Sequence, residues 1–231
     1  MILPPRLDDS CHLWYDFTSI KNNTVYDQSR YGNHGTVYGA TPVGRFGLHG
    51  THYDGVDDYM RANNVVTDKI FTIIIFFEKV LPFSSGETLF DTRDDWFGSG
   101  GKGIAISRYS DTEQYWVGIG DGTNKSWGGN FTVIDGKKFV VLRSDGNNLD
   151  VIVNQQLINS RDISSLGSIY ANDKMYFASN FGGDSNAKVN IYFSAFYNRA
   201  LSDAEIRELY YYLTKGIRSI IPSRFVARAT G

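Results

Sequence analysis

The stretch His52-Tyr53-Asp54-Gly55-Val56-Asp57-Asp58-Tyr59-Met60 has the pattern of a tight turn between two strands. Asp54-Gly55 suits the turn, because glycine accepts a positive φ angle and aspartate hydrogen-bonds its own backbone. Tyr53 and Tyr59 then fall on the flanking strands, and Asp57-Asp58 can cap nearby backbone N–H groups. The segment therefore predicts strands on both sides of one turn.

Further strand signals surround this turn. Asp-Gly dipeptides at 121–122, 135–136 and 145–146 mark hairpins, because these residues tolerate the positive φ angles of primed turns. Phe71–Phe77 is apolar almost throughout, which is typical of a central strand covered on both faces. The expected strands are Phe71–Val80, Gly103–Tyr109, Gln114–Ile119, Phe139–Arg143, Leu149–Val153, Met175–Ala178 and Val189–Tyr197.

One helix is expected near the end of the chain. Ser202-Asp203-Ala204-Glu205 is a capping box, in which serine accepts from an unpaired N–H and glutamate reaches back. Ile206, Leu209 and Leu213 follow at helical spacing, and Gly216 can end the helix. A single helix after many strands is expected to pack on one edge of a sandwich.

Composition agrees with an all-β protein. The chain has 231 residues, 15% aromatic residues, 24 Gly and 5 Pro, which is typical of strands joined by turns. Sandwiches of about 200–250 residues commonly form one domain. The single cysteine, Cys11, excludes an internal disulfide framework and a cysteine-based zinc site. We expect one domain over residues 1–215 and a separate tail over 216–231.

The net charge of -2 divides unevenly along the chain. Leu213–Gly231 carries +4 and no acid, and the remainder carries -6 (19 basic against 25 acidic residues). A basic segment on an acidic body can bind a partner or its own fold. Isoleucines interleave with the arginines, so we expect the tail to dock on protein and not on nucleic acid. The predicted docking residues are Arg218, Arg224, Phe225 and Arg228.

Three segments together resemble a known family. They are Leu13–Thr36, which includes Asp27-Gln28-Ser29-Arg30-Tyr31-Gly32-Asn33; Leu48–Met60, with its Asp-Gly turn; and Phe196–Ile206, which reads Phe-Tyr-Asn-Arg-Ala-Leu-Ser-Asp-Ala-Glu-Ile. Their order and spacing resemble the laminin-G-like branch of the concanavalin A-like lectin/glucanase superfamily, over roughly residues 12–212. The resemblance implies a two-sheet antiparallel jelly-roll sandwich with one short C-terminal helix. It does not imply one function, because this superfamily contains lectins, glycosidases, adhesion modules and virion proteins.

Sugar binding is one function that the residues favour. Lectins stack sugars on aromatic faces and bond the hydroxyls with polar side chains. Trp96 and Trp127 are expected in polar or glycine-rich loops, with Asp94 and Asn130 beside them. The alternative is that both tryptophans cover the ends of the sandwich. Trp14 and Trp116 lie in strand-like runs and are expected in the core.

Catalytic motifs are missing from the sequence. Glycosidases of this superfamily carry acids in a Glu-x-Asp-x-x-Glu run, and none of the five glutamates lies in one. No Gly-x-Ser-x-Gly elbow occurs, and His49-x-x-His52 lacks a third zinc ligand in a recognisable pattern. A structural calcium ion is compatible with the loop acids, although their spacing places no site. Those acids are Asp91, Asp94, Asp95, Asp121 and Asp184.

Three functions therefore remain open. The first is a non-enzymatic virion structural protein, such as a bacteriophage capsid-decoration or fibre-associated component, joined through the tail to other virion proteins or to itself. The second is a carbohydrate-binding lectin module, and the third is a glycoside-active enzyme. The N-terminus lacks a basic region followed by an apolar core, so we expect synthesis in a cytoplasm without a signal peptide. The longest apolar run is too short to span a bilayer, so no membrane partner is expected.

Overall fold

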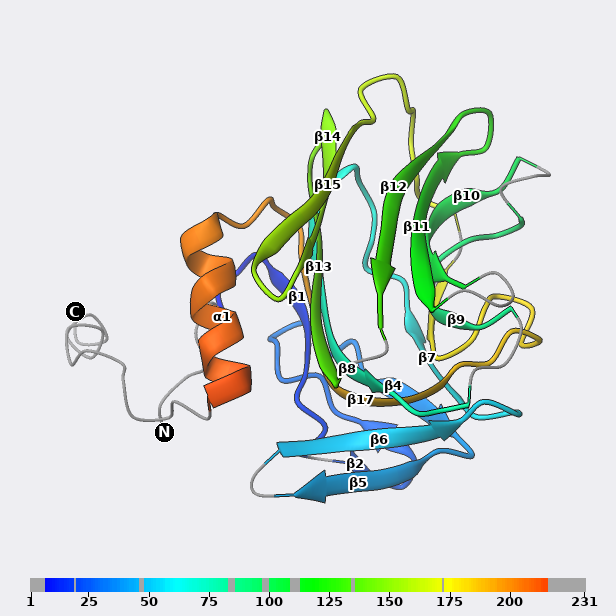
Figure 1. The fold of residues 1–231 in the computed structure, drawn as a ribbon, viewed down its shortest axis with the longest axis vertical. Helices are drawn as coiled ribbons and strands as arrows, with labels where there is room; N and C mark the ends of the chain where they lie inside the picture. The colour runs from blue at the N-terminus through cyan, green and yellow to red at the C-terminus, as the bar shows by residue number, and fades with distance from the viewer. Residues whose placement is uncertain are drawn as a thin grey trace.

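The computed structural model describes residues 7–18, 20–45, 48–82, 86–96, 100–108, 113–133, 136–171 and 173–215. Two antiparallel sheets pack face to face, and one helix lies outside them (Figure 1). This arrangement confirms the predicted all-β sandwich. The tail 216–231, with Arg218, Arg224, Phe225 and Arg228, lies outside the described residues, so its docking and the domain boundary stay predictions.

The two sheets have eight and nine strands. The first is ordered β15 (Gln156–Asp162), β14 (Asn148–Val153), β13 (Lys137–Asp145), β8 (Ile70–Lys79), β17 (Lys188–Tyr197), β6 (Leu48–Asp54) and β5 (Thr41–Arg45), and β1 (Cys11–Tyr15) also pairs with β17. The second is ordered β12 (Lys125–Thr132), β11 (Gln114–Asp121), β10 (Lys102–Ser107), β9 (Thr88–Asp91), β16 (Lys174–Phe177), β7 (Tyr59–Asn63), β4 (Gly35–Tyr38), β3 (Thr24–Val25) and β2 (Ile20–Lys21). Strands therefore lie at each segment where the sequence predicts one.

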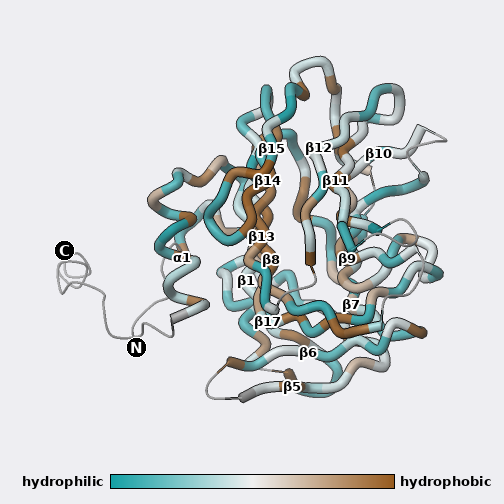
Figure 2. Tube along the Cα trace, in the orientation of Figure 1, coloured by the Kyte–Doolittle hydropathy of each residue, from teal (hydrophilic) through white to brown (hydrophobic). Residues whose placement is uncertain are grey.

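The main core lies between the sheets. Alternate residues of β11, Tyr115, Val117 and Ile119, are fully buried in it, as their period-two spacing predicts. β8 is buried on both faces, because Ile73 and Ile75 point into this core and Ile74 points to the other side. Hydrophobic residues accordingly gather along β8, β13 and β14 (Figure 2). The alternation on β11 shows which face of the nine-stranded sheet points outward, and the outer residues of β8 need a cover on the other sheet.

The helix α1 (Asp203–Lys215) begins at the predicted capping box. It does not pack on an edge of the sandwich, as the sequence led us to expect, but covers the outer face of the eight-stranded sheet (Figure 1). Ile206 and Leu209 join a second apolar cluster there with Trp14 and Phe193. A central strand that is apolar on both faces needs this cover, because its outer side chains would otherwise face water.

Candidate functional site

A row of directly opposed residues crosses the outer face of the nine-stranded sheet. Antiparallel partners that face each other share one side of a sheet. Because the core takes the intervening residues, this row points away from the core. Seven strands contribute, so the row spans about 29 Å at about 4.8 Å per strand. Its members, from β12 to β4, are Trp127, Gly118, Ala105, Asp91, Tyr176, Arg61 and Thr36.

A β-bulge at Gly128 places Trp127 on this face. Gly129 opposes Val117 and Trp127 opposes Gly118, so Gly128 is an extra residue on β12. Strict alternation from Asn130, which opposes Trp116, would have turned Trp127 toward the core. The extra residue shifts the alternation by one, and Trp127 is 41% exposed.

The prediction that Trp116 lies in the core is wrong. Trp116 is half-buried on the outer face, since the core takes its neighbours Tyr115 and Val117. Its ring meets Trp127 edge to face, with centroids 5.0 Å apart. Asn130 lies opposite Trp116 and donates from Nδ2 to Gln114 Oε1 at 3.4 Å. Two of the predicted sugar-binding residues, Trp127 and Asn130, therefore flank one half-buried tryptophan.

Trp96 reaches the same face from the loop after β9. The Arg93 guanidinium lies 4.7 Å from the Trp96 ring centre and 5.9 Å from that of Trp116. Phe181 meets Trp96 edge to face at 5.6 Å and also packs against Arg93. We call these four rings, Trp96, Trp116, Trp127 and Phe181, the tryptophan cluster. Arg93 contacts both Trp96 and Trp116, and Trp116 in turn contacts Trp127, so Arg93 joins the two ends of the cluster. Trp96 is 40% exposed.

A buried ion pair holds Arg93 in place. Arg93 is 1% exposed, and its Nε and Nη2 donate to both oxygens of Asp91 at 2.9 and 2.8 Å. Burial raises the pKa of Asp91, and the bonds from Arg93 oppose that shift. The Phe181 backbone N–H also bonds Asp91, at 3.3 Å. Arg93 thus serves as a fixed support for the rings and not as an open ligand-binding charge.

The far end of the face carries tyrosines. Tyr38 and Tyr59 stack with centroids 4.4 Å apart and planes 14° apart. The Arg61 guanidinium lies over Tyr38 and donates to its hydroxyl at 3.0 Å. Flat rings beside hydrogen-bonding groups suit a sugar, whose C–H faces stack while its hydroxyls bond.

Asp94, the remaining predicted sugar-binding residue, is exposed beside Trp96 and accepts from the Lys102 backbone N–H at 2.8 Å. The sequence analysis did not select Trp116, Arg93, Phe181 or the tyrosines as members of a binding site. The available signal was Gly128-Gly129 inside a strand, because glycines there often mark a bulge that redirects a side chain.

The five acids that were compatible with calcium do not form one group. Asp91 is occupied by Arg93, and Asp95 accepts from the Trp96 backbone N–H. Asp121 accepts three backbone N–H groups, led by that of Gly167, which lower its pKa to about 2. Asp184 bonds the Asn180 side chain at 2.6 Å. These acids therefore bond to separate parts of the chain, and Asp121 ties its turn to the segment at Gly167.

A different set of acids could hold a cation. Within the described ranges, one carboxylate oxygen each from Asp54, Asp57 and Asp58 lies within 4.8 Å of the others. Burial raises the pKa of Asp58, and the two neighbouring carboxylates raise it further. Hard oxygen ligands of this kind suit calcium. The Asp54 N–H also donates to Asp58 at 3.0 Å, so the group has a structural role in the turn as well.

The two-sheet fold and the aromatic outer face of the nine-stranded sheet are those of a lectin-like jelly roll. The family model of the concanavalin A-like lectin/glucanases superfamily matches residues 54–207. The chain belongs to this superfamily, as its three motifs led us to expect. No curated protein matches the chain. The structure contains no helix, among the residues that it describes, with the length and apolarity needed to cross a bilayer.

Solved structures with the same fold include binding domains of botulinum neurotoxins. The binding domain of neurotoxin DC in complex with rat synaptotagmin II has 18% identity and a TM-score of 0.69, over 89% of this chain and 52% of that one. The same domain in complex with SialylT has 17% identity and a TM-score of 0.70, over 90% and 52%. The serotype G binding domain has 16% identity and a TM-score of 0.70, over 87% and 51%. Our chain spans about half the length of these domains, and the likeness concerns the fold.

Proposed function

We propose that this protein is a non-enzymatic lectin-like module that binds a glycan on the tryptophan cluster. The main support is the bulge at Gly128, which turns Trp127 outward beside Trp116 and leaves Trp127 41% exposed. Single exposed rings are common on protein surfaces, whereas neighbouring aromatic rings that form one patch mark a binding site. Trp127 and Trp116 are such neighbours, with ring centroids 5.0 Å apart. Asn130 lies opposite Trp116 on the neighbouring strand, and Asp94 precedes Trp96 by two residues, so both can supply hydrogen-bonding groups.

Substitution of the exposed rings tests this proposal. On a glycan array, Trp96→Ala and Trp127→Ala should each weaken binding about tenfold, which corresponds to about 1.4 kcal/mol. Tyr211→Ala is the matched control, since Tyr211 is equally exposed (41%) but lies on α1, outside the other sheet. Binding that is absent, or that does not change in either tryptophan variant, would contradict the proposal.

The non-enzymatic part of the proposal rests on the acids. Glycoside hydrolysis needs two carboxyl groups about 5–9.5 Å apart, on either side of the scissile bond. Two of the five glutamates are held by internal contacts: Glu87 by Lys79 and Glu205 by Arg199. Release of reducing sugar from any polysaccharide by the purified protein would overturn this part.

The biological setting that we propose is a virion, in which the chain is a capsid-decoration or fibre-associated component. Its support is the sequence of the tail, where apolar residues alternate with the basic residues Arg218, Arg224 and Arg228. Deleting residues 216–231 should abolish incorporation into particles, or self-association, and leave glycan binding unchanged. Incorporation of the shortened chain at the full level would refute tail docking.

A further inference from the structure

A second row of polar residues crosses the opposite side of the molecule, on the outer face of the eight-stranded sheet. His52, Asn190, Glu78 and Lys137 are consecutive cross-strand partners on β6, β17, β8 and β13. We call them the polar row. Directly opposed residues share one face, so the four side chains stand side by side. None of them belongs to the tryptophan cluster, which lies on the other sheet.

A β-bulge at Tyr192 opens a pocket beside this row. On β17, Ile191 opposes Phe77 and Phe193 opposes Phe76, so Tyr192 is an extra residue without a partner on β8. At the same point the other side of β17 changes partner, since β6 pairs with it up to Ile191 and β1 from Ser194. Bulges often redirect a side chain at a functional site.

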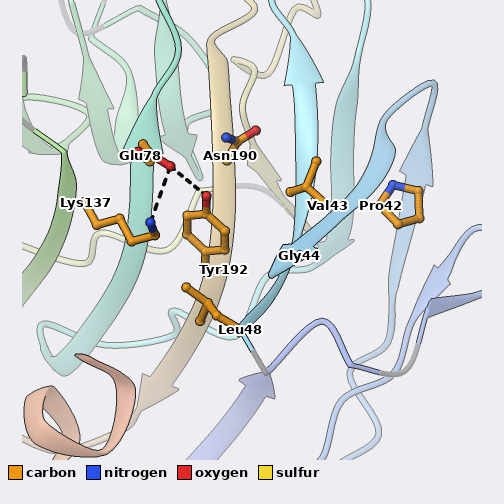
Figure 3. A pocket seen from close by; sticks show the side chains of 8 residues that line it. All are labelled: Pro42, Val43, Gly44, Leu48, Glu78, Lys137, Asn190 and Tyr192. Atoms are coloured by element: carbon orange, nitrogen blue, oxygen red, sulfur yellow. Dashed lines mark hydrogen bonds and ion pairs between the residues drawn. The ribbon is translucent and has the colours of Figure 1, made fainter. Parts of the chain in front are cut away.

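The pocket has a volume of about 510 Å³, which is within the range of small-ligand sites. Figure 3 shows Asn190 and Tyr192 side by side on one strand, with Glu78 and Lys137 on one side of them. The other side is an apolar wall from the β5–β6 hairpin, formed by Pro42, Val43, Gly44 and Leu48. The site therefore has a polar floor against an apolar wall.

Internal contacts hold the polar groups in position. The Tyr192 hydroxyl donates to Glu78 Oε2 at 2.7 Å, and Lys137 Nζ lies 3.7 Å from the same oxygen (Figure 3). Asn190 Oδ1 bonds His52 Nδ1 at 2.8 Å. Tyr192 is 8% exposed, packed between Phe76 and the Lys137 ammonium. The floor is thus arranged before any ligand arrives, which reduces the entropic cost of binding.

The charges and bonding groups of the pocket indicate the class of ligand. Glu78 and Lys137 neutralise each other, so an anion or a cation gains no net attraction. Among the described residues, Tyr192 and Lys137 both contact the Glu78 carboxylate at Oε2. Its Oε1 can therefore accept from a ligand, and Lys137 can donate. The side chains of Glu78 and Lys137 are 32% and 39% exposed. A neutral ligand with an apolar face and hydroxyls that donate and accept meets these conditions.

We propose that this pocket is a second binding site, specific for a neutral mono- or disaccharide. The apolar wall, Val43 and Leu48, would contact the C–H face of the sugar ring, and the polar row would bond its hydroxyls. The site is independent of the tryptophan cluster, so the proposed function and this proposal can fail separately. If both hold, the protein binds sugars on two opposite faces.

Nuclear magnetic resonance titration of the ¹⁵N-labelled full chain tests the proposal. The probes are glucose, galactose, N-acetylglucosamine, lactose and maltose, with acetate and ethylammonium as charged small probes. We expect at least one sugar to shift the Asn190 side-chain amide and the Tyr192 backbone amide, more strongly than either charged probe at equal concentration. The proposal is overturned if no sugar shifts these signals or if a charged probe binds more tightly.

Variants assign the binding to the pocket. Glu78→Gln and Asn190→Ala should each weaken the sugar at this site at least tenfold, whereas Trp127→Ala should not change it. Glu113→Gln removes the same charge at an exposed position outside the pocket and serves as the matched control. Both pocket positions are partly exposed, so the amide spectra should show that the variants fold. Equal affinity in Glu78→Gln and in the control would refute the assignment.

Discussion

At the scale of single residues, Glu205 both caps the start of α1 and forms an ion pair. It accepts from the Ser202 backbone N–H at 2.8 Å, which completes the capping box, and it pairs with Arg199 at 2.8 Å. The bond from Arg199 is the main reason that the pKa of Glu205 falls to about 2. Asp8 binds the same guanidinium at 3.0 Å, so the helix start is also tied to the N-terminal segment.

The lowered pKa makes this contact sensitive to acid. Ionised Glu205 stabilises the fold fully above its unfolded pKa of about 4.3, and this contribution is lost as the pH falls toward 2. Glu205→Gln keeps the capping geometry and removes the charge, so it should cost about 1 kcal/mol at pH 7. Thermal unfolding of both proteins from pH 7 to pH 2 should show this difference shrinking as the pH falls. A difference that stays constant over the range would contradict the assignment.

At the scale of elements, two bulges decide which side chains reach the surface. The bulge on β12 turns Trp127 outward, and the bulge on β17 adds Tyr192 to the outer face of the other sheet. At each bulge the register changes by one residue. Such a shift moves the following side chains to the other face of the sheet. The two proposed binding sites each depend on one of these irregularities.

Gly129 makes the first bulge testable. Its φ angle is +104°, and a Cβ atom there would lie 2.4 Å from Asn159 Nδ2 on β15. Gly129→Ala should destabilise the fold by about 1–3 kcal/mol, because alanine rarely adopts this backbone conformation. It should also weaken glycan binding by displacing Trp127.

Gly136→Ala is the control for Gly129→Ala, since its φ angle is also positive (+64°). Apart from its neighbours in the chain, no described residue has an atom within 4 Å of the added Cβ. Chemical denaturation should show a smaller loss for the control, and its glycan binding should equal that of the wild type. Equal losses of stability in the two variants would mean that contact with β15 does not matter.

At the scale of the whole molecule, a buried ion cluster joins the two sheets. Lys79 on β8 donates to Glu87 at 2.7 Å, and both side chains are fully buried. Arg108, which follows β10, lies 3.8 Å from the other Glu87 oxygen, and Tyr115 on β11 donates to that oxygen at 3.1 Å. Burial lowers the pKa of Lys79, and the bond to Glu87 opposes that shift.

Removing the charge of Glu87 should therefore strongly lower the stability of the fold. Glu87→Gln leaves Lys79 and Arg108 without the negative charge that compensates both, and we expect a loss of about 3–5 kcal/mol in unfolding free energy. Arg30→Gln breaks the exposed pair with Asp9 and should cost less than about 1 kcal/mol. Urea unfolding of the two variants measures both values. Similar losses would show that the cluster does not couple the sheets.

Local sequence patterns predicted the strands, the turns and the helix, and the resemblance to a known family added the two-sheet jelly roll. Tyr115, Val117 and Ile119 alternate with outward residues as their spacing predicted, and Ser202 with Glu205 set the start of α1. These patterns involve residues close together in the chain, so they are visible in the sequence without knowledge of which strands pair. Trp127 was correctly selected as an exposed ring, because the Gly-rich segment around it resembled a loop, although it lies on a strand.

The two proposed sites depend on features that only the tertiary structure decided. Trp116 was expected in the core, yet strand register places it outside, beside a ring that a bulge has turned outward. In the polar row His52 bonds Asn190, which is 138 residues away. The sequence around either residue does not predict this contact. Local chemistry selects strands, turns and caps, whereas the pairing of distant strands determines which side chains share a face and where a pocket opens.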